Sequence, residues 1–160
     1  MSRKKILITG GAGFIGSKLT KSLLDLGHRI VVLDCLSPQV HSDPSETHKK
    51  IEELGSDVKF VLGDVTCRQD LIESLQGVDS VVHLAAETGT GQSMYAIEHY
   101  TNVNIGGTAL LLDVIANEKF PIKSLVVASS RAVYGEGKYR CLEHGVIYPG
   151  TRSKVFLSKG

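Results

Sequence analysis

The sequence predicts an α/β fold in which a doubly wound parallel sheet is covered by helices on both faces. Short, continuously apolar runs alternate along the chain with segments of helical periodicity. Runs without polar alternation are typical of strands that are buried on both faces, and right-handed crossovers between them build a doubly wound sheet. A glycine cluster, Gly10 to Gly16, separates the first apolar run from the first helical pattern.

Five strands are expected, and each is an apolar run that stops at small or polar residues. They cover residues 6–9, 30–33, 58–62, 81–86 and 125–130. The first helix is predicted from Phe14, with Gly27 just past its end in the position that favours glycine. Its apolar face is expected to consist of Phe14, Ile15, Leu19, Leu23, Leu24 and Leu26.

Three further connections are predicted between the strands. Residues 38–50 are polar and read as a loop, with a short helix through Leu54. Thr66 is expected to cap a helix that runs to Leu75. A long helix is expected from Ser93 to Asn117, with a bend at Gly106-Gly107.

Length and composition describe an ordinary globular domain. The 160 residues can bury a sizeable core, and the composition is 42% hydrophobic and 22% charged. A net charge of +1 gives no sign of nucleic-acid binding. No apolar run is long enough for a membrane span, and the start of the chain does not resemble a signal peptide. Scattered free thiols indicate a reducing cytoplasm; they are Cys35, Cys67 and Cys141.

The glycine cluster predicts a site for a dinucleotide pyrophosphate. Gly10 permits a tight turn, Gly13 lets the backbone approach the phosphates, and Gly16 lets the helix pack closely. The helix N-terminus then faces the anion. Two registers fit, one starting at Gly10 and one at Gly11, and the alternative is a turn that only holds a helix against a strand.

Asp34 ends the second strand and lies 18 residues beyond Gly16. This spacing is close to that expected of the carboxylate that binds the adenosine ribose. Cys35 and Ser37 follow it and complete this part of the predicted cofactor site. No arginine comes next, and a carboxylate repels a 2′-phosphate, so NAD is favoured over NADP. Asp64-Val65, after the third strand, is similarly placed for the adenine. The alternatives are a strand-end aspartate and a helix N-cap region.

Five motifs in this order resemble the extended short-chain dehydrogenase/reductase family, specifically its NAD-dependent nucleotide-sugar epimerases and dehydratases. They are Thr9–Gly16, Gly63–Val65, His83–Ala86, Asn104–Thr108 and Ser129–Gly135. The segments 85–95 and 134–141 are most similar to the dTDP-L-rhamnose 4-epimerase branch. The resemblance implies a Rossmann domain, NAD as cofactor, a nucleotide-sugar substrate such as a dTDP-sugar, and a homodimer.

The resemblance also implies residue roles. Ser130 would be the catalytic hydroxyl, and Asn104 would hold backbone or cofactor groups on the nicotinamide side. The remaining cofactor contacts would be the backbone of Phe14 and Ile15, together with Leu84, Ala85, Ala86 and Thr88. His83 is expected to be a satisfied core histidine.

The reaction implied by the resemblance is transient oxidation of a sugar to a keto sugar, followed by hydride return to the other face. Arg131-Ala132 follow Ser130 in place of an acidic pair, which favours an epimerase over a dehydratase; a dehydrogenase stays open. A non-catalytic NAD-binding module is the other alternative.

The tyrosine base of the family, in a Tyr-x-x-x-Lys helix, is not found convincingly. Tyr134 and Lys138 have the spacing, but two glycines lie between them. Tyr148 and Arg152 have the wrong cation and a Pro-Gly turn. We therefore expect an NAD-binding domain at residues 1–135, the start of an insert at residues 136–160, a sheet that is incomplete after its fifth strand, and an inactive 160-residue chain; a complete short protein is the alternative.

Cys141 and His144 have metal-ligand spacing but supply only half a site, so no metal is predicted and a structural loop is favoured. The resemblance would add a further cysteine pair downstream.

Overall fold

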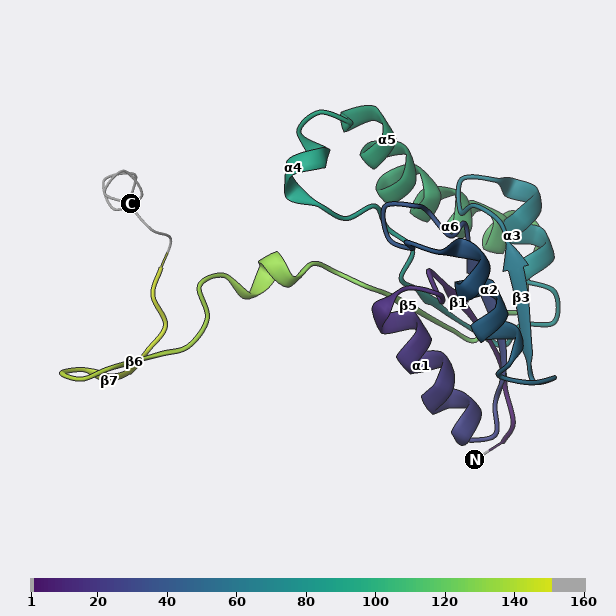
Figure 1. The fold of residues 1–160 in the computed structure, drawn as a ribbon, viewed down its shortest axis with the longest axis horizontal. Helices are drawn as coiled ribbons and strands as arrows, with labels where there is room; N and C mark the ends of the chain where they lie inside the picture. Colours follow the sequence, from purple (N-terminus) through teal and green to yellow (C-terminus); the bar gives the residue numbers. More distant parts are fainter. Residues whose placement is uncertain (1, 151–160) are drawn as a thin grey trace. The chain divides into compact units, whose positions relative to one another are not determined.

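The computed structural model describes residues 2–150, and the chain divides into two compact units, Met1–Ala128 and Ser129–Gly160. Figure 1 shows the elements of both. The predicted domain boundary after residue 135 stays a prediction. The strands of the first unit are β1 (Lys5–Thr9), β2 (Arg29–Asp34), β3 (Val58–Leu62), β4 (Ser80–His83) and β5 (Ser124–Val127). Its helical segments are α1 (Phe14–Asp25), α2 (Pro44–Glu52), α3 (Arg68–Ser74), α4 (Thr90–Ser93), α5 (Ile97–Thr101), η1 (Asn102–Gly107) and α6 (Thr108–Asn117).

The five strands form one parallel sheet in the order β3-β2-β1-β4-β5. Leu7 in β1 pairs with Val31 in β2 and with Val81 in β4, so β1 lies at the centre. The strand order reverses between β1 and β4, which makes their carboxyl ends the switch point of the sheet. The doubly wound sheet is confirmed, and it ends at the fifth strand as predicted.

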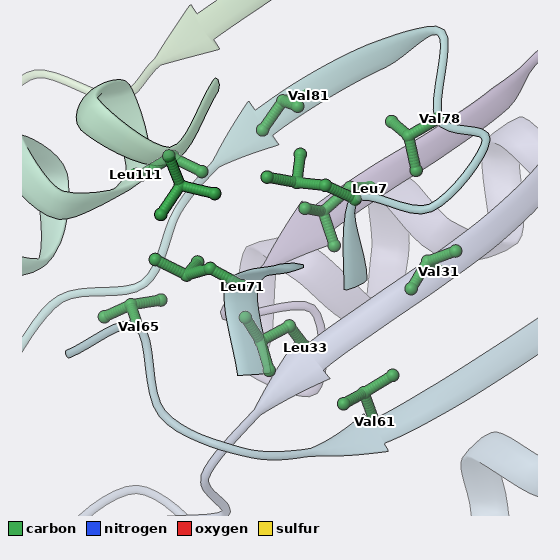
Figure 2. Packing of buried hydrophobic residues seen from close by; sticks show 11 residues of the cluster. Leu7, Val31, Leu33, Val61, Val65, Leu71, Val78, Val81 and Leu111 are labelled. Atoms are coloured by element: carbon green, nitrogen blue, oxygen red, sulfur yellow. The ribbon is translucent and has the colours of Figure 1, made fainter. Parts of the chain in front are cut away.

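Two apolar clusters cover the two faces of the sheet. One joins Leu7, Val31 and Val81 to side chains of α3 and α6 such as Leu71 and Leu111 (Figure 2). The other joins Ile6, Ile8, Ile30 and Val32 to Ile51 of α2 and to the partly buried Leu19, Leu23 and Leu24 of α1. Burial on both faces is the physical reason why these strands read as continuous apolar runs.

The first helix is partly mispredicted in its apolar face. Leu19, Leu23 and Leu24 pack on the sheet, whereas Leu26 is exposed, as are two residues of the first turn, Phe14 at 84% and Ile15 at 66%. The two apolar side chains of this first turn therefore do not belong to the cluster on the sheet. Gly27 follows the helix as predicted, with φ +81°.

The strand after the third crossover is shorter than predicted, because it ends at His83 and not at Ala86. The amides of Leu84 and Ala85 lie 3.2 Å from the Thr9 hydroxyl oxygen and can donate to it. The Thr9 hydroxyl therefore holds the start of this segment next to the end of β1. The fifth strand likewise ends at Val127, before the predicted Ser130.

Two helix predictions are also wrong. Thr66 does not cap α3, whose N-cap is Cys67; Thr66 donates both its amide and its hydroxyl to Asp64. The helix predicted from Ser93 to Asn117 is interrupted after α4, and it resumes at Ile97. Its π-helical turn, η1, lies where the bend was expected.

The second unit holds a 3₁₀ turn, η2 (Arg131–Tyr134), and an antiparallel hairpin of β6 (Tyr139–Cys141) and β7 (Gly145–Ile147). The hairpin was not predicted, because residues 136–160 read as an insert or loop. Among the residues that the structure describes, no helix is long and apolar enough to cross a membrane.

Candidate functional site

The turn after β1 is built from glycines that have close neighbours. Gly10 has φ +67°, and its amide donates to Leu33 O at 2.8 Å. A Cβ on Gly10 would lie 2.8 Å from the Ala85 amide nitrogen, and one on Gly16 would lie 2.3 Å from the Gly10 carbonyl oxygen. Gly16 therefore lets α1 pack against the turn itself.

Gly13, in contrast, has a single close neighbour. A Cβ there would meet only the Gly10 carbonyl oxygen, at 3.3 Å. Gly13 is the N-cap of α1, has no side-chain cap, and is followed by a first turn without acidic residues. The first amides of a helix have no partner within the helix, so this end of α1 offers N–H donors and a positive dipole end to an anion.

Asp34 lies at the end of β2, beside this turn, and is 9% exposed. Its Oδ2 accepts the Ala12 amide at 3.0 Å, and its Oδ1 accepts the Leu36 amide at 2.9 Å. The buried His41 ring approaches the same Oδ1 to 3.6 Å through Nε2. The carboxylate is therefore held in one orientation by both neighbouring loops.

The two residues after Asp34 that were predicted to contact a cofactor differ in their roles. Cys35 is an exposed residue whose thiol is partly buried. This burial raises the pKa of the thiol, and the carboxylates of Asp34 and Asp64 raise it further. The Ser37 carbonyl accepts the amides of Val40 and His41, each at 2.9 Å. Ser37 thus closes the turn that displays Gln39.

Asp64 and Val65 follow β3 and are held differently. The amide of Asp64 donates to Asp70 Oδ2 at 2.8 Å, and Asp64 Oδ1 accepts from Thr66. Val65 is 5% exposed and belongs to the core, where its side chain would meet a Cβ on Gly107 at 2.8 Å. Only the backbone of Val65 is therefore available to a ligand.

A buried polar network supports the centre of the sheet end. His83 Nδ1 lies 2.7 Å from Thr9 Oγ1, and His83 Nε2 lies 3.0 Å from Thr108 Oγ1. His83 is 3% exposed, and burial lowers its pKa. Both ring nitrogens have partners, as the prediction of a satisfied core histidine requires.

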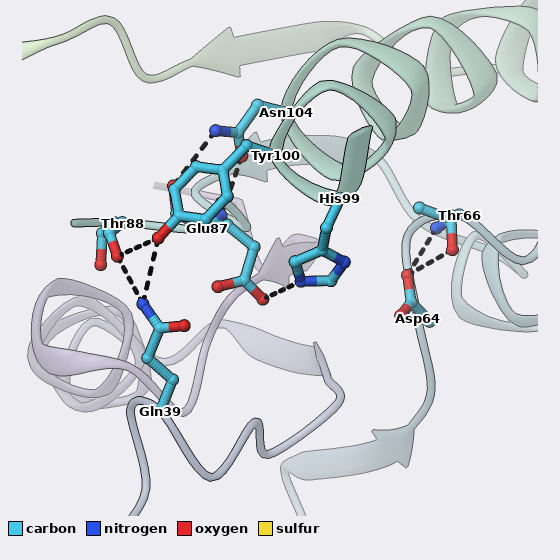
Figure 3. Close-up of polar contacts among 8 residues, drawn as sticks. All are labelled: Gln39, Asp64, Thr66, Glu87, Thr88, His99, Tyr100 and Asn104. Carbon is cyan, nitrogen blue, oxygen red and sulfur yellow. Dashed lines mark hydrogen bonds and ion pairs between the residues drawn. The ribbon is translucent and has the colours of Figure 1, made fainter. Parts of the chain in front are cut away.

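The segment after β4, residues 84–88, is held by side chains from distant parts of the chain (Figure 3). Asn104 in η1 bonds the backbone of Glu87 twice, because its Oδ1 accepts the amide at 2.8 Å and its Nδ2 donates to the carbonyl at 3.1 Å. Glu87 Oε1 pairs with His99 Nε2 at 3.2 Å, while Oε2 is buried and has no hydrogen-bond partner among the described residues.

One contact joins this segment to the loop after β2. Gln39 Nε2 donates to the Thr88 carbonyl oxygen at 2.6 Å and to the Tyr100 hydroxyl at 3.2 Å, and that hydroxyl donates to the same carbonyl at 2.8 Å (Figure 3). We call Gln39, Thr88 and Tyr100 the Gln39 bridge. Sequence reasoning missed Gln39, His41, Glu87 and Tyr100, and no local pattern marks them.

Ser130 and the two metal-ligand candidates lie in the second unit. Ser130 is exposed, and its carbonyl accepts the Val133 amide at 3.2 Å. Cys141 Sγ and His144 Nδ1 lie 3.3 Å apart at the turn of the hairpin. No group of three or more potential metal ligands occurs within residues 2–150.

The second unit contains the tyrosines of both candidate Tyr-x-x-x-Lys pairs. Tyr134 is the last residue of η2, and Gly135 and Gly137 have φ of +63° and +84°. Tyr134 and Lys138 are therefore not one helical turn apart. The other pair includes Arg152, which lies outside the described residues.

A glycine turn ahead of a helix, with a carboxylate at the neighbouring strand end, characterises the dinucleotide-binding α/β proteins. Within that class, the chain belongs to the NAD dependent epimerase/dehydratase family, which matches residues 6–150.

Two curated relatives show how much of a family member is present. The chain is 40% identical over 157 residues to dTDP-L-rhamnose 4-epimerase of Burkholderia thailandensis, covering 96% of this chain and 42% of the relative. It is 36% identical over 133 residues to UDP-glucose 4-epimerase of Bacillus subtilis, covering 81% and 38%. The chain thus spans about two fifths of the length of these relatives.

Solved structures agree with this placement. UDP-glucose 4-epimerase of Brucella ovis, crystallised with NAD, matches with a TM-score of 0.67 and 32% identity, over 82% of this chain and 37% of that chain. An epimerase of Methanothermobacter thermautotrophicus matches with a TM-score of 0.72 and 28% identity, over 92% and 42%.

Proposed function

We propose that the first unit binds NAD, with the pyrophosphate against the glycine turn. The helix end at Gly13, which has no side-chain cap and no acidic residue in its first turn, is the observation that carries this proposal. The backbone amides of Phe14 and Ile15 would donate to the phosphates. Their exposed apolar side chains would be covered in part when a ligand is bound.

Asp34 would accept the hydroxyls of the adenosine ribose. Each of its oxygens already accepts one backbone amide, and each carboxylate oxygen has a further lone pair. The two amides orient the group in advance, and its charge would repel a 2′-phosphate. NAD is therefore the proposed cofactor rather than NADP.

The other predicted cofactor residues keep their roles as proposals, with limits that the contacts set. Val65 could offer only its backbone, and Asn104 acts through the backbone of Glu87 because both ends of its amide are engaged there. The remaining proposed contacts are Cys35, Ser37, Asp64, Leu84, Ala85, Ala86 and Thr88.

The relatives are more than twice as long as this chain. For a protein of that length that contains this chain, we propose nucleotide-sugar 4-epimerase activity. The relatives named as 4-epimerases support this reaction, and the 40% identity to a dTDP-L-rhamnose 4-epimerase supports a dTDP-sugar as substrate. Bound NAD supplies a hydride acceptor that can return the hydride. Ser130 would hold the reacting oxygen of the sugar through its hydroxyl.

The 160 residues alone are proposed to be inactive. Positive φ at Gly135 and Gly137 argues against Tyr134 and Lys138 as the catalytic pair. A tyrosine and a lysine from elsewhere would complete the site. A dehydratase or dehydrogenase is the second candidate, and Arg131-Ala132 after Ser130, in place of an acidic pair, argues against the dehydratase.

Calorimetric titration of the chain with NAD tests the cofactor proposal. The natural chain should bind NAD, and Gly13→Val should lose binding because its branched side chain would keep the phosphates away from the first amides of α1. Circular dichroism checks that both proteins fold alike, since a Cβ at this position would lie 3.3 Å from the Gly10 carbonyl oxygen. Equal affinity for NAD in the two proteins would refute the pyrophosphate assignment.

Product analysis tests the reaction in a longer protein that carries this chain. An epimerase interconverts two sugar isomers without net NADH and without loss of water. Accumulation of NADH would identify a dehydrogenase, and a dehydrated product would identify a dehydratase. A protein that binds NAD and converts no nucleotide sugar would support the non-catalytic module.

A further inference from the structure

The Gln39 bridge lies across the switch point of the sheet. Gln39 stands five residues past the end of β2, and Thr88 stands five residues past the end of β4. These two strands flank β1 on its two sides. A contact between the segments that follow them must therefore span the carboxyl end of β1, where the glycine turn begins.

Both ends of the bridge are fixed to the body of the domain. On one side, the Ser37 carbonyl closes the turn that presents Gln39, and the same loop is tied to Asp34 through the Leu36 amide and His41. On the other side, Asn104 clamps the residue next to Thr88.

The third member of the bridge, Tyr100, is 9% exposed, so its ring is packed and its hydroxyl is held in place. The bridge is thus a contact between two anchored loops.

We propose that the Gln39 bridge closes over bound NAD and slows its release. This inference rests on the proposed cofactor site, because ligands of doubly wound sheets lie across the strand ends at the switch point. An epimerase needs such retention, since the hydride taken from a sugar must return from the same cofactor molecule. The bridge consists of three hydrogen bonds that close on one carbonyl and one hydroxyl. A contact of this kind can open and close again when the cofactor exchanges.

The test measures the dissociation rate of NAD from the whole 160-residue chain. Radiolabelled NAD is bound first and is then chased with excess unlabelled NAD. Gln39→Ala removes the donor, and Tyr100→Phe removes the hydroxyl while the ring stays packed. Each variant should release NAD about five- to tenfold faster, because each loses two hydrogen bonds of ordinary net strength. The double variant should release NAD no faster than the product of the two single fold-changes predicts, since Gln39 and Tyr100 donate to the same carbonyl oxygen.

Matched controls separate the bridge from general effects of the substitutions. Gln76→Ala removes a glutamine of the surface whose side chain donates to Ile72 O of the neighbouring helical turn, and Tyr95→Phe alters a tyrosine that is 88% exposed. Both controls should release NAD within about twofold of the natural rate. Thermal unfolding of all variants shows whether the fold is kept.

Two results would overturn the inference while the cofactor site stands. NAD could leave the bridge variants at the natural rate, or it could bind them more tightly, which would mean that the bridge obstructs the site. A natural chain that binds no NAD at all would instead refute the proposed function.

Discussion

The two loops that meet at the switch point are shaped by different forces. The glycine turn after β1 is determined by local backbone geometry, because Gly10 needs a positive φ and Gly16 has no room for a Cβ. The segment after β4 has no such local constraint between Leu84 and Thr88. It is held by Thr9, Asn104, Gln39 and Tyr100, all at least 12 residues away in the sequence.

This difference teaches which substitutions matter in each loop. In the glycine turn, adding a Cβ should lower the stability of the fold. The segment after β4 should instead be destabilised when a distant side chain that holds it is removed. The predictions below use this contrast, from the largest expected effect to the smallest.

Gly16→Ala should destabilise the first unit by about 3 kcal/mol, because overpacking against backbone cannot be relieved by a rotamer change. The new Cβ would lie 2.3 Å from the Gly10 carbonyl oxygen. Urea unfolding measures the change. Gly91→Ala in α4 is the control, since within residues 2–150 no atom outside its own helix and chain neighbours lies within 4 Å of its Cβ position, and it should be neutral or slightly stabilising. Equal stability of the two variants would contradict the close packing of the turn.

Asn104→Ala should cost about 2 kcal/mol, because the amide and the carbonyl of Glu87 lose their partners together. The same denaturant experiment measures it, and hydrogen exchange should show faster exchange of the Glu87 amide. Asn117→Ala is the matched control, since that side chain donates to Asp113 Oδ1 on the surface. An Asn104 variant as stable as this control would show that the segment after β4 is held locally after all.

Asp34→Ala should weaken NAD binding about tenfold, which corresponds to ~1.4 kcal/mol. The substitution removes the proposed ribose acceptor and also releases the amides of Ala12 and Leu36. Discrimination against NADP should decline because the repelling charge is gone. Calorimetry with both cofactors measures the ratio of their dissociation constants, and an unchanged ratio would count against the ribose assignment.

The smallest expected effect is that of His83→Gln, which should change how the free energy of unfolding depends on pH. Burial lowers the pKa of His83 below its ordinary value of 6.5. As pH falls through that value, the unfolded chain binds a proton that the folded chain does not, so stability declines until the folded histidine is also protonated. The loss begins near pH 6.5 and is absent at higher pH.

Unfolding followed from pH 7.5 downward measures this dependence, with His48→Gln, at a half-exposed histidine of α2, as control. The natural chain and the control should lose stability more steeply with acid than His83→Gln does. Parallel pH profiles for all three proteins would remove His83 as the cause. The network that links β1, β4 and α6 would then not depend on the charge state of the ring.

The sequence by itself determined the doubly wound parallel sheet and the position of the glycine turn. Burial on both faces leaves an unmistakable run of apolar residues, and a positive φ at Gly10 or a close contact at Gly16 admits hardly any residue but glycine. The carboxylate at Asp34 was also predicted from its distance to Gly16. These features depend on residues that are neighbours in the chain or that repeat with a fixed period.

Only the tertiary structure decided what holds these features in place. Thr66 has the side chain of a helix cap, yet Asp64 lies close enough to accept both of its donors, so the cap is not formed. Phe14 and Ile15 fit a helical apolar face, yet both side chains are exposed. The bridge between Gln39, Thr88 and Tyr100 exists because the strand order brings together segments 49 and 61 residues apart. A pairing of this kind follows from topology, which local sequence patterns do not encode.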